Sequence, residues 1–267
     1  MLSLNTNMTS LMIQKNLQKA TAGISSALEQ LTTGYRINHA KDDPANYAIM
    51  KNMEVKLNSW GIAEENINIG YNMLETAASS AELVSAHIMR IRDLCEQACN
   101  GTYGEQSIKA IQAEVQGRLD EISRIKASTE FNGIKLFEDN KSVNIQIGID
   151  SSENSRLAVS TGLTLEGLSD IEINEVSNPQ ILDKLDGVLN ELNRYQTKIG
   201  AYQNRLSYSL EYAELMTNNL TSSLSTIRDA DIAKVSSDLI RFQILQQACI
   251  TLLATANQQP ALALQLL

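Results

Sequence analysis

The feature that most constrains the fold is a pair of very long stripes of apolar residues at helical spacing. Between residues 44 and 101, apolar side chains recur at steps of three, four or seven positions, and a second stripe of the same kind occupies residues 178–227. Such spacing places the apolar side chains on one face of an α-helix. At about 1.5 Å per residue, the first helix would be roughly 80 Å long. We therefore expect each long helix to lie against a partner of comparable length.

Both long helices have a clear start signal. Asp43 precedes Pro44, and Asn178 precedes Pro179, so each predicted helix has a capping side chain followed by a proline. A carboxylate or amide oxygen can accept a hydrogen bond from a free backbone N–H of the first turn, and proline suits the first helical position. Only three prolines occur in the chain and aromatic residues make up 4%, which favours helices over a sheet-centred core.

Shorter elements complete the predicted architecture. Helical spacing indicates a first helix over residues 13–34 and a third helix over residues 108–125, with Asn132-Gly133 as a turn after it. Between residues 143 and 160, apolar and polar residues alternate, which predicts a small β-hairpin. We expect a mainly α protein: an elongated antiparallel bundle or coiled coil of long helices with a small β-hairpin region.

The two ends of the chain are expected to pair. Residues 13–31 and 232–256 both carry apolar residues at steps of three and four, the spacing of a seam between helices. The predicted domains are a terminal helical domain, residues 1–43 plus 228–267, and a rod domain, residues 44–177 plus 178–227, which contains the hairpin.

Charge and composition argue against several functions. The net charge is −9 and the sequence pI is about 4.8, which disfavours nucleic acid and anionic membranes as partners. The chain has no uninterrupted apolar run of about 20 residues, the length that a membrane-spanning helix needs. The N-terminus lacks the pattern of a cleaved signal peptide. With only His39 and His87, and no phosphate loop or metal-ligand spacing, we predict no enzyme, metal or cofactor. Cys95, Cys99 and Cys249 are interpreted as small buried apolar residues.

The C-terminal segment suggests self-assembly. After Arg241 it carries no charged side chain, and a free pair of terminal helices would bury too little apolar surface to offset its ordering entropy. We expect neighbouring copies to cover the exposed face and to order it, in an open contact that generates a helical filament. An ordinary bundle that never polymerises fits the same spacing. The candidate polymerisation stripe comprises Ile232, Val235, Leu239, Phe242, Leu245, Leu253, Leu262, Leu266 and Leu267.

Several longer motifs resemble bacterial flagellins. These are LTTGYRINHAKDDPANYAI at residues 31–49, MRIRDLCEQACNGT at 89–102, FNGIKLF at 131–137, and IRDADIAKVSSDLIRFQILQQACITLLATANQQP at 227–260. They occur in the flagellin order and together cover most of the chain. The sequence is therefore identified as resembling a flagellin in minimal form, since only residues 164–177 stand where the family usually has a variable outer domain.

The resemblance implies a function in the flagellum. Flagellins place the paired termini in the inner tube of the filament and the long helices in a surrounding layer, and they leave the cell through the flagellar export channel without a cleaved signal. The expected location is therefore extracellular. The implied partners are further copies of the chain, the filament cap, hook-associated proteins, and an export chaperone that covers residues 229–267.

A further implied partner is Toll-like receptor 5, which binds the second and third helices of many flagellins. The positions that match are Arg90, Leu94 and Glu114, with Arg92, Gln97 and Arg205 as neighbours. Arg90 and Leu94 are four residues apart and share a helix face. Alternatively, these charges are solvated and Leu94 packs in the helix seam. Exposure of Leu94 would favour a binding face, and burial would favour packing.

Two other protein classes compete with a filament subunit. A hook–filament junction adaptor shares the terminal helices and the export route, but it would match the flagellin motifs more weakly, especially at the C-terminus. A cytoplasmic coiled-coil scaffold would stay in the cell and would have ordered ends without assembly. Because motifs at both ends match well, we favour the structural subunit of the flagellar filament.

Overall fold

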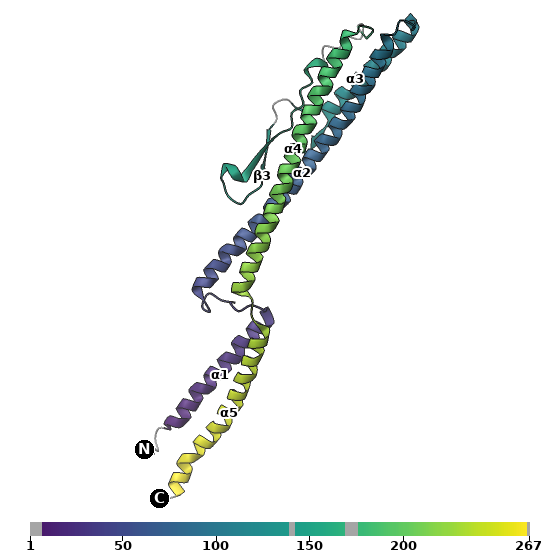
Figure 1. The fold of residues 1–267 in the computed structure, drawn as a ribbon. Coiled ribbons are helices and arrows are strands. Elements are labelled where there is room, and N and C mark those ends of the chain that lie inside the picture. The colour runs from purple at the N-terminus through teal and green to yellow at the C-terminus, as the bar shows by residue number, and fades with distance from the viewer. Residues whose placement is uncertain (1–6, 139–141, 169–175, 266–267) are drawn as a thin grey trace. The chain divides into compact units, whose positions relative to one another are not determined.

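The computed structural model describes residues 7–138, 142–168 and 176–265, and most of these are helical (Figure 1). The chain divides into two compact units, residues 1–57 with 218–267 and residues 58–217. The helices are α1 (Met8–Thr33), α2 (Pro44–Ala98), α3 (Glu105–Ser128), α4 (Gln180–Arg228) and α5 (Ile232–Gln265), with 3-10 turns η1 (Glu153–Ser155) and η2 (Glu166–Leu168). The strands are β1 (Glu130–Phe131), β2 (Ile134–Lys135), β3 (Ser142–Gln146) and β4 (Arg156–Ser160).

The core of the unit formed by residues 58–217 lies between α2, α3 and α4, which run side by side in Figure 1. The buried side chains repeat at helical spacing, as the sequence predicts. The largest fully buried residues of the three helices are Ile67, Leu74, Ile88 and Ile91 of α2, Ile122 of α3, and Leu185, Leu192, Ile199 and Leu206 of α4. The prediction of a mainly α bundle is confirmed.

Polar contacts between α2 and α4 are spread along this seam. The Thr217 hydroxyl donates to Glu64 at 2.8 Å, and the Gln203 amide donates to Glu75 at 2.8 Å. These bonds lie at the edge of an apolar interface, where polar groups keep access to water. Each of them fixes which turn of α4 lies beside which turn of α2.

The predicted start of α2 is confirmed in detail. The Asp43 carboxylate accepts the backbone N–H of Asn46 at 3.0 Å, and Pro44 is the first helical residue. At the other long helix, the Asn178 side chain accepts the N–H of Gln180 at 3.1 Å, so the helical assignment begins one residue after Pro179. The first helix ends where glycine permits it, since Gly34 adopts φ +75° and its N–H bonds to the Gln30 carbonyl.

Two hairpins follow α3. Asn132 and Gly133 both have positive φ, 50° and 78°, and join the short strands β1 and β2, which is the backbone of the Asn-Gly hairpin turn. The sequence predicted this turn but not the strands on either side of it. The second hairpin, β3 with β4, pairs Ser142 with Ser160 and Gln146 with Arg156, and confirms the hairpin predicted at 143–160.

The β3–β4 hairpin is held on the helices by close packing. A Cβ on Gly70 of α2 would lie 2.5 Å from the Ile145 side chain, so a larger residue would force Ile145 to shift. Tyr195 of α4 donates its buried hydroxyl to the Thr161 carbonyl just after β4. Burial raises the pKa of this phenol well above its ordinary value. The hairpin is therefore part of the bundle core rather than a free appendage.

In the other unit, α1 and α5 lie side by side, as predicted for the terminal helices (Figure 1). Asn7 donates to the Ala256 carbonyl at 2.7 Å, and Ser10 donates to Asn257 at 3.0 Å. Gln246 contacts Thr21 at 3.3 Å nearer the middle of the pair. The start of α1 thus lies beside the distal part of α5, and the two helices are antiparallel.

The segments that follow α1 and α4 are joined to each other, which no sequence motif indicated. Tyr35 pairs with Asp229 in an antiparallel bridge, and the Ala230 N–H donates to the Gly34 carbonyl. The Arg228 guanidinium lies 4.3 Å from the centre of the Tyr35 ring and 3.9 Å from Glu54. The compact units divide inside α2 and α4, so the predicted domain boundaries at 43/44 and 227/228 stay a prediction.

The two glycines of α2 allow a matched test of hairpin packing. Gly61 has open space where a Cβ would be placed, whereas Gly70 meets Ile145. Alanine at Gly61 should raise the free energy of unfolding by up to about 1 kcal/mol through helix propensity. Alanine at Gly70 should be less stable than that variant by about 1–3 kcal/mol because of overpacking. Urea unfolding monitored by circular dichroism measures both, and equal stabilities would contradict the packing.

Candidate assembly and partner-binding surfaces

The seam between α1 and α5 consists of small residues against larger ones. Ala20 and Ala27 of α1 are buried, and the Phe242 ring covers Gly23 so closely that a Cβ there would lie 2.7 Å from the ring carbons. Val235, Cys249 and Ala256 of α5 are also buried. One side of each terminal helix is therefore buried against the other helix within the subunit.

The remaining sides of the two helices expose large apolar side chains. Met8 is 70% exposed and Ile244 is 61% exposed. An uncovered apolar surface of this kind marks an interaction site. The other exposed members are Leu11, Met12 and Leu28 of α1, and Ile232, Ile240, Leu245, Ile250 and Leu252 of α5.

The predicted polymerisation stripe is divided between these two surfaces. Val235 is buried and Leu239, Phe242 and Leu253 are half-buried, whereas Ile232 and Leu245 are exposed. These residues follow one another at helical spacing, but α1 covers them unequally, because a two-helix pair buries only one side of α5. Their part in polymerisation stays a prediction. The side chain of Leu262, and the whole of Leu266 and Leu267, lie outside what the structure describes.

The apolar character of α5 is higher than expected. Over Ile232–Gln258, its length and mean hydropathy are those of a helix that can cross a membrane, and little of this stretch is buried within the subunit. The sequence argument relied on uninterrupted apolar runs, and scattered Gln, Asn and Thr residues hide this property. The same composition also suits a helix that is surrounded by other helices.

Two of the predicted receptor contacts, Arg90 of α2 and Glu114 of α3, lie together on the exposed surface of these helices. The Glu114 carboxylate lies 2.9 Å from the Arg118 guanidinium and 3.5 Å from Nε of Arg90. The hydrogen bond from Arg118, with the charge of Arg90, lowers the pKa of Glu114 below its ordinary value. Arg90 and Glu114 are thus brought together and stay accessible, with side-chain exposures of 44% and 41%.

The other predicted contacts differ from one another. Leu94 is only 2% exposed, so its burial favours packing in the helix seam over direct contact with a partner. Arg92 donates to Asp186 of α4 at 2.6 Å, which joins α2 to α4. Gln97 and Arg205 are both exposed. The apolar stripe of residues 44–101 includes Leu94, and its burial next to Ile91 agrees with that spacing.

The cysteines are largely buried, as predicted. Cys95 and Cys249 are buried and Cys99 is partly covered, and all three are free thiols. Burial raises the pKa of the Cys95 thiol to about 11, so little reactive thiolate forms at neutral pH. His39, in the segment before α2, lies 2.7 Å from Glu29.

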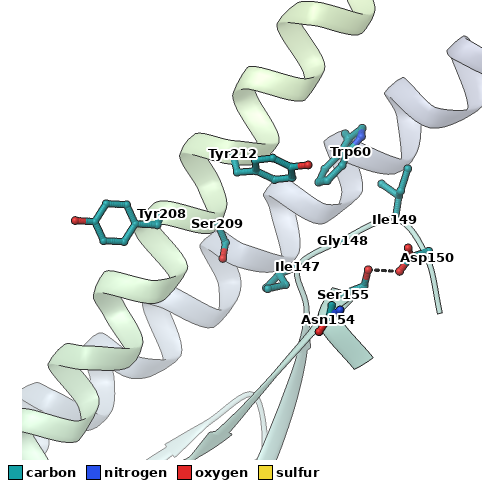
Figure 2. A pocket seen from close by; sticks show the side chains of 10 residues that line it. All are labelled: Trp60, Ile147, Gly148, Ile149, Asp150, Asn154, Ser155, Tyr208, Ser209 and Tyr212. Atoms are coloured by element: carbon teal, nitrogen blue, oxygen red, sulfur yellow. Dashed lines mark hydrogen bonds between the residues drawn. The ribbon is translucent and has the colours of Figure 1, made fainter. Parts of the chain in front are cut away.

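One hollow of about 450 Å³ lies between the tip of the β3–β4 hairpin and the helices (Figure 2). Trp60 and Tyr212 meet edge to face, with ring centres 5.7 Å apart, and Ile147 comes from the hairpin side. Asp150 accepts hydrogen bonds from Ser152 and Ser155, which hold its pKa below the ordinary value. The carboxylate is therefore committed to the turn at the hairpin tip.

These observations define a class of protein. Within the described residues, no group of three or more His, Cys, Asp or Glu side chains converges as a metal site. The polar groups of the hollow serve the hairpin turn, while the terminal helices expose apolar sides. Exposed apolar sides on a pair of helices are typical of the class of proteins that assemble through such helices.

Comparison with known proteins identifies the family. Residues 4–142 match the bacterial flagellin N-terminal helical region, and residues 182–267 match the C-terminal helical region. The chain is 33% identical to a flagellin of Halalkalibacterium halodurans and 30% identical to a 33 kDa flagellar filament core protein of Treponema phagedenis, each over 99% of both chains. The chain belongs to the bacterial flagellin family. It is a non-enzymatic subunit of the flagellar filament, and it assembles outside the cell.

Solved structures agree with the fold. The structure of Bacillus cereus flagellin, 23% identical, superposes with a TM-score of 0.51 over 56% of this chain and 88% of that chain. A hook-associated protein from Vibrio parahaemolyticus, 16% identical, gives 0.50 over 75% of this chain. The junction adaptor is thus less well supported than the filament subunit, because the full-length relatives are flagellins. The short length also fits the absence of an outer domain.

The Arg92–Asp186 pair predicts a pH-dependent stability. The hydrogen bond and charge of Arg92 lower the pKa of the Asp186 carboxyl. Ionised Asp186 therefore contributes stability above its unfolded pKa of about 3.9, and this contribution is lost as the pH falls through the lower folded pKa. We expect the native protein to be more stable than Asp186→Asn near neutral pH, and equally stable at strongly acidic pH.

Urea titrations at a series of pH values measure the difference in free energy of unfolding between the native chain and Asp186→Asn. The double variant Arg92→Gln with Asp186→Asn, compared with Arg92→Gln alone, is the control and should show a much smaller dependence on pH. If the native chain and Asp186→Asn differ in stability by the same amount at every pH, the ion pair does not stabilise the fold.

Proposed function

We propose that the chain polymerises through the uncovered apolar sides of α1 and α5, and that assembly orders these helices. The exposure of Met8, Ile244 and Leu252 outside the α1–α5 seam is the observation that supports this proposal. A single pair of helices buries apolar surface on one side only, and this is too little to outweigh the conformational entropy that ordering removes. Contacts with neighbouring copies supply the missing burial.

The same surface suggests how the free subunit is handled before assembly. We propose that a flagellin export chaperone covers α5, because its exposed apolar residues would otherwise associate within the cell. The subunit then leaves through the flagellar export channel without a cleaved signal peptide and joins the filament beneath its cap. The filament cap and the hook-associated proteins are the other proposed partners in the flagellum.

A charge placed on the uncovered side of α5 should block assembly. Ile244→Asp buries a carboxylate in the proposed contact between copies, whereas Gln243→Asp adds the same charge at a neighbouring exposed polar position. After seeding with sheared filaments, electron microscopy should show long filaments for the native chain and for Gln243→Asp. It should show none for Ile244→Asp or for a chain that lacks residues 233–267.

Two results would contradict this proposal. Filaments formed by the deletion variant would show that α5 is not needed, and filaments from Ile244→Asp would show that this side stays outside the contact. Hydrogen exchange of α1 and α5 should be fast in the monomer and slow in the filament. Equal protection from hydrogen exchange in the monomer and the filament would show that folding of these helices is not coupled to assembly.

We further propose that Arg90 and Glu114 form the centre of a contact with Toll-like receptor 5. Both side chains are accessible and adjacent, and Arg92 and Gln97 supply half-exposed and exposed polar groups on the following turns of α2. Arg205 is exposed but lies on α4 close to Gln203, which bonds to Glu75, so it is not a neighbour of Arg90. The role left for buried Leu94 is to hold the α2 turn that carries Arg90. An arginine–carboxylate pair offers charge-assisted hydrogen bonds to a polar partner.

Receptor activation tests this second proposal. Arg90→Ala and Glu114→Ala should each lower receptor affinity by about fivefold or more, the range of an interface residue that contributes above 1 kcal/mol. Arg124→Ala is the matched control, because Arg124 is an exposed arginine of α3 that pairs with Glu121 on the same helix. Equal responses of all three variants in a receptor reporter assay would show that Arg90 and Glu114 do not contribute to the contact.

A further inference from the structure

The acidic residues are distributed very unevenly along the chain. It has 31 Asp and Glu residues, yet none lies before Glu29 or after Asp238. The two acid-free segments are neighbours in space, because Asn7 and Ser10 of α1 bond to residues 256 and 257 of α5. We call the described parts of these segments, residues 7–28 and 239–258, the acid-free tip.

In α1, the exposed side of the tip changes from apolar to basic along the helix. Met8, Leu11, Met12, Lys15 and Lys19 follow one another at steps of one, three or four residues, so they lie on one stripe. All five are exposed, and the methionines and leucine are nearest the Asn7 end. The two lysines lie about 10–16 Å behind Met8 at 1.5 Å per residue.

In α5, a second stripe has the same order. Leu252 is nearest the distal end, Ile244 and Leu245 follow, and Arg241 lies behind them, all exposed and at helical spacing. Arg241 forms an ion pair with Asp238 at 2.9 Å, just outside the tip, and its guanidinium also lies over the Phe242 ring. Each stripe thus has apolar side chains toward the shared end and a basic side chain behind them, and exposed apolar residues recur farther back, at Leu28 of α1 and Ile240 of α5.

This arrangement has the chemistry of a membrane-surface element. Helices that bind at the interface insert apolar side chains into the acyl boundary and place Lys and Arg at the headgroups. The apolar stretch of α5 from Ile232 to Gln258 is long, and little of it is buried. We infer that the free subunit binds membranes containing anionic lipid through the acid-free tip.

The charge of the rest of the chain restricts this contact to the tip. All acidic residues lie outside the tip while the whole chain has a net charge of −9, so an anionic surface repels the remainder of the subunit. The tip uses the same apolar residues that we propose for contacts between copies. Membrane binding is therefore a property of the free subunit, and assembled filaments should not show it.

Vesicle flotation of the full-length monomer tests the inference. Vesicles of phosphatidylcholine alone are compared with vesicles that also contain phosphatidylglycerol, at low and high salt. The monomer should float with the anionic vesicles and much less with the neutral ones. Each Lys or Arg near an anionic surface strengthens binding about fivefold, so Lys15→Gln, Lys19→Gln and Arg241→Gln together should weaken it about a hundredfold.

A matched triple variant controls for net charge. Lys109→Gln, Lys198→Gln and Arg194→Gln also remove two lysines and one arginine, all of them exposed and far from the tip in sequence, and they should bind like the native chain. Seeded polymerisation of both triple variants shows that the terminal helices still assemble. An increase in helicity when anionic vesicles are added provides a second readout.

Four results would overturn the inference. The first is no flotation with either vesicle, and the second is equal flotation with both vesicles that neither salt nor the tip variant changes. The third is that the monomer binds to immobilised polyglutamate but does not float with vesicles, which would show that the tip binds an acidic protein partner. Loss of binding in the control triple variant to the same extent would also show that the tip is not the site.

Discussion

The structure depends on the burial of narrow apolar stripes between very long helices. Isolated helices are marginally stable in water, and most of their stability in proteins comes from tertiary packing of one apolar face. Leu74, Ile88, Leu192 and Leu206 are fully buried in this seam. The polar bonds from α4 to Glu64 and Glu75 add register more than strength, because the first is only part-buried and the second is exposed to water. The hairpins and the exposed charged cluster on α2 and α3 take their positions from this seam.

The terminal helices α1 and α5 also depend on burial of apolar side chains, but within the subunit only one side of each helix is buried. Gly23 and Phe242 fit closely, as a pair in a finished core would. On the other sides, Met12 and Ile244 stay exposed, so the pair is complete only when another surface covers it. The long helices of the bundle also expose some apolar side chains, such as Ile62 and Leu215, but they have a fully buried seam as well.

Much of this fold could be predicted from the sequence, and the reasons are local. Stripe spacing, the Asp43 cap and the Asn132-Gly133 turn each depend on residues close together in the chain. The unequal burial along the α5 stripe was not predictable in this way, because it depends on which neighbour covers each side of a helix. For Leu94, spacing offered packing in the seam as one of two alternatives, and burial favours it. The bridge between Tyr35 and Asp229 joins residues far apart in sequence, and neither residue type signals such a contact.

Charge distribution explains how one apolar surface can serve more than one purpose. A uniformly acidic subunit would be repelled by other copies and by anionic membranes alike, whereas here the repulsion is confined to the region between Glu29 and Asp238. The terminal helices therefore approach one another, or a membrane, without a carboxylate to desolvate. Because the occupants compete for Ile244 and Leu252, a subunit in the filament has no free tip. Assembly then withdraws the most apolar part of the molecule from every other partner.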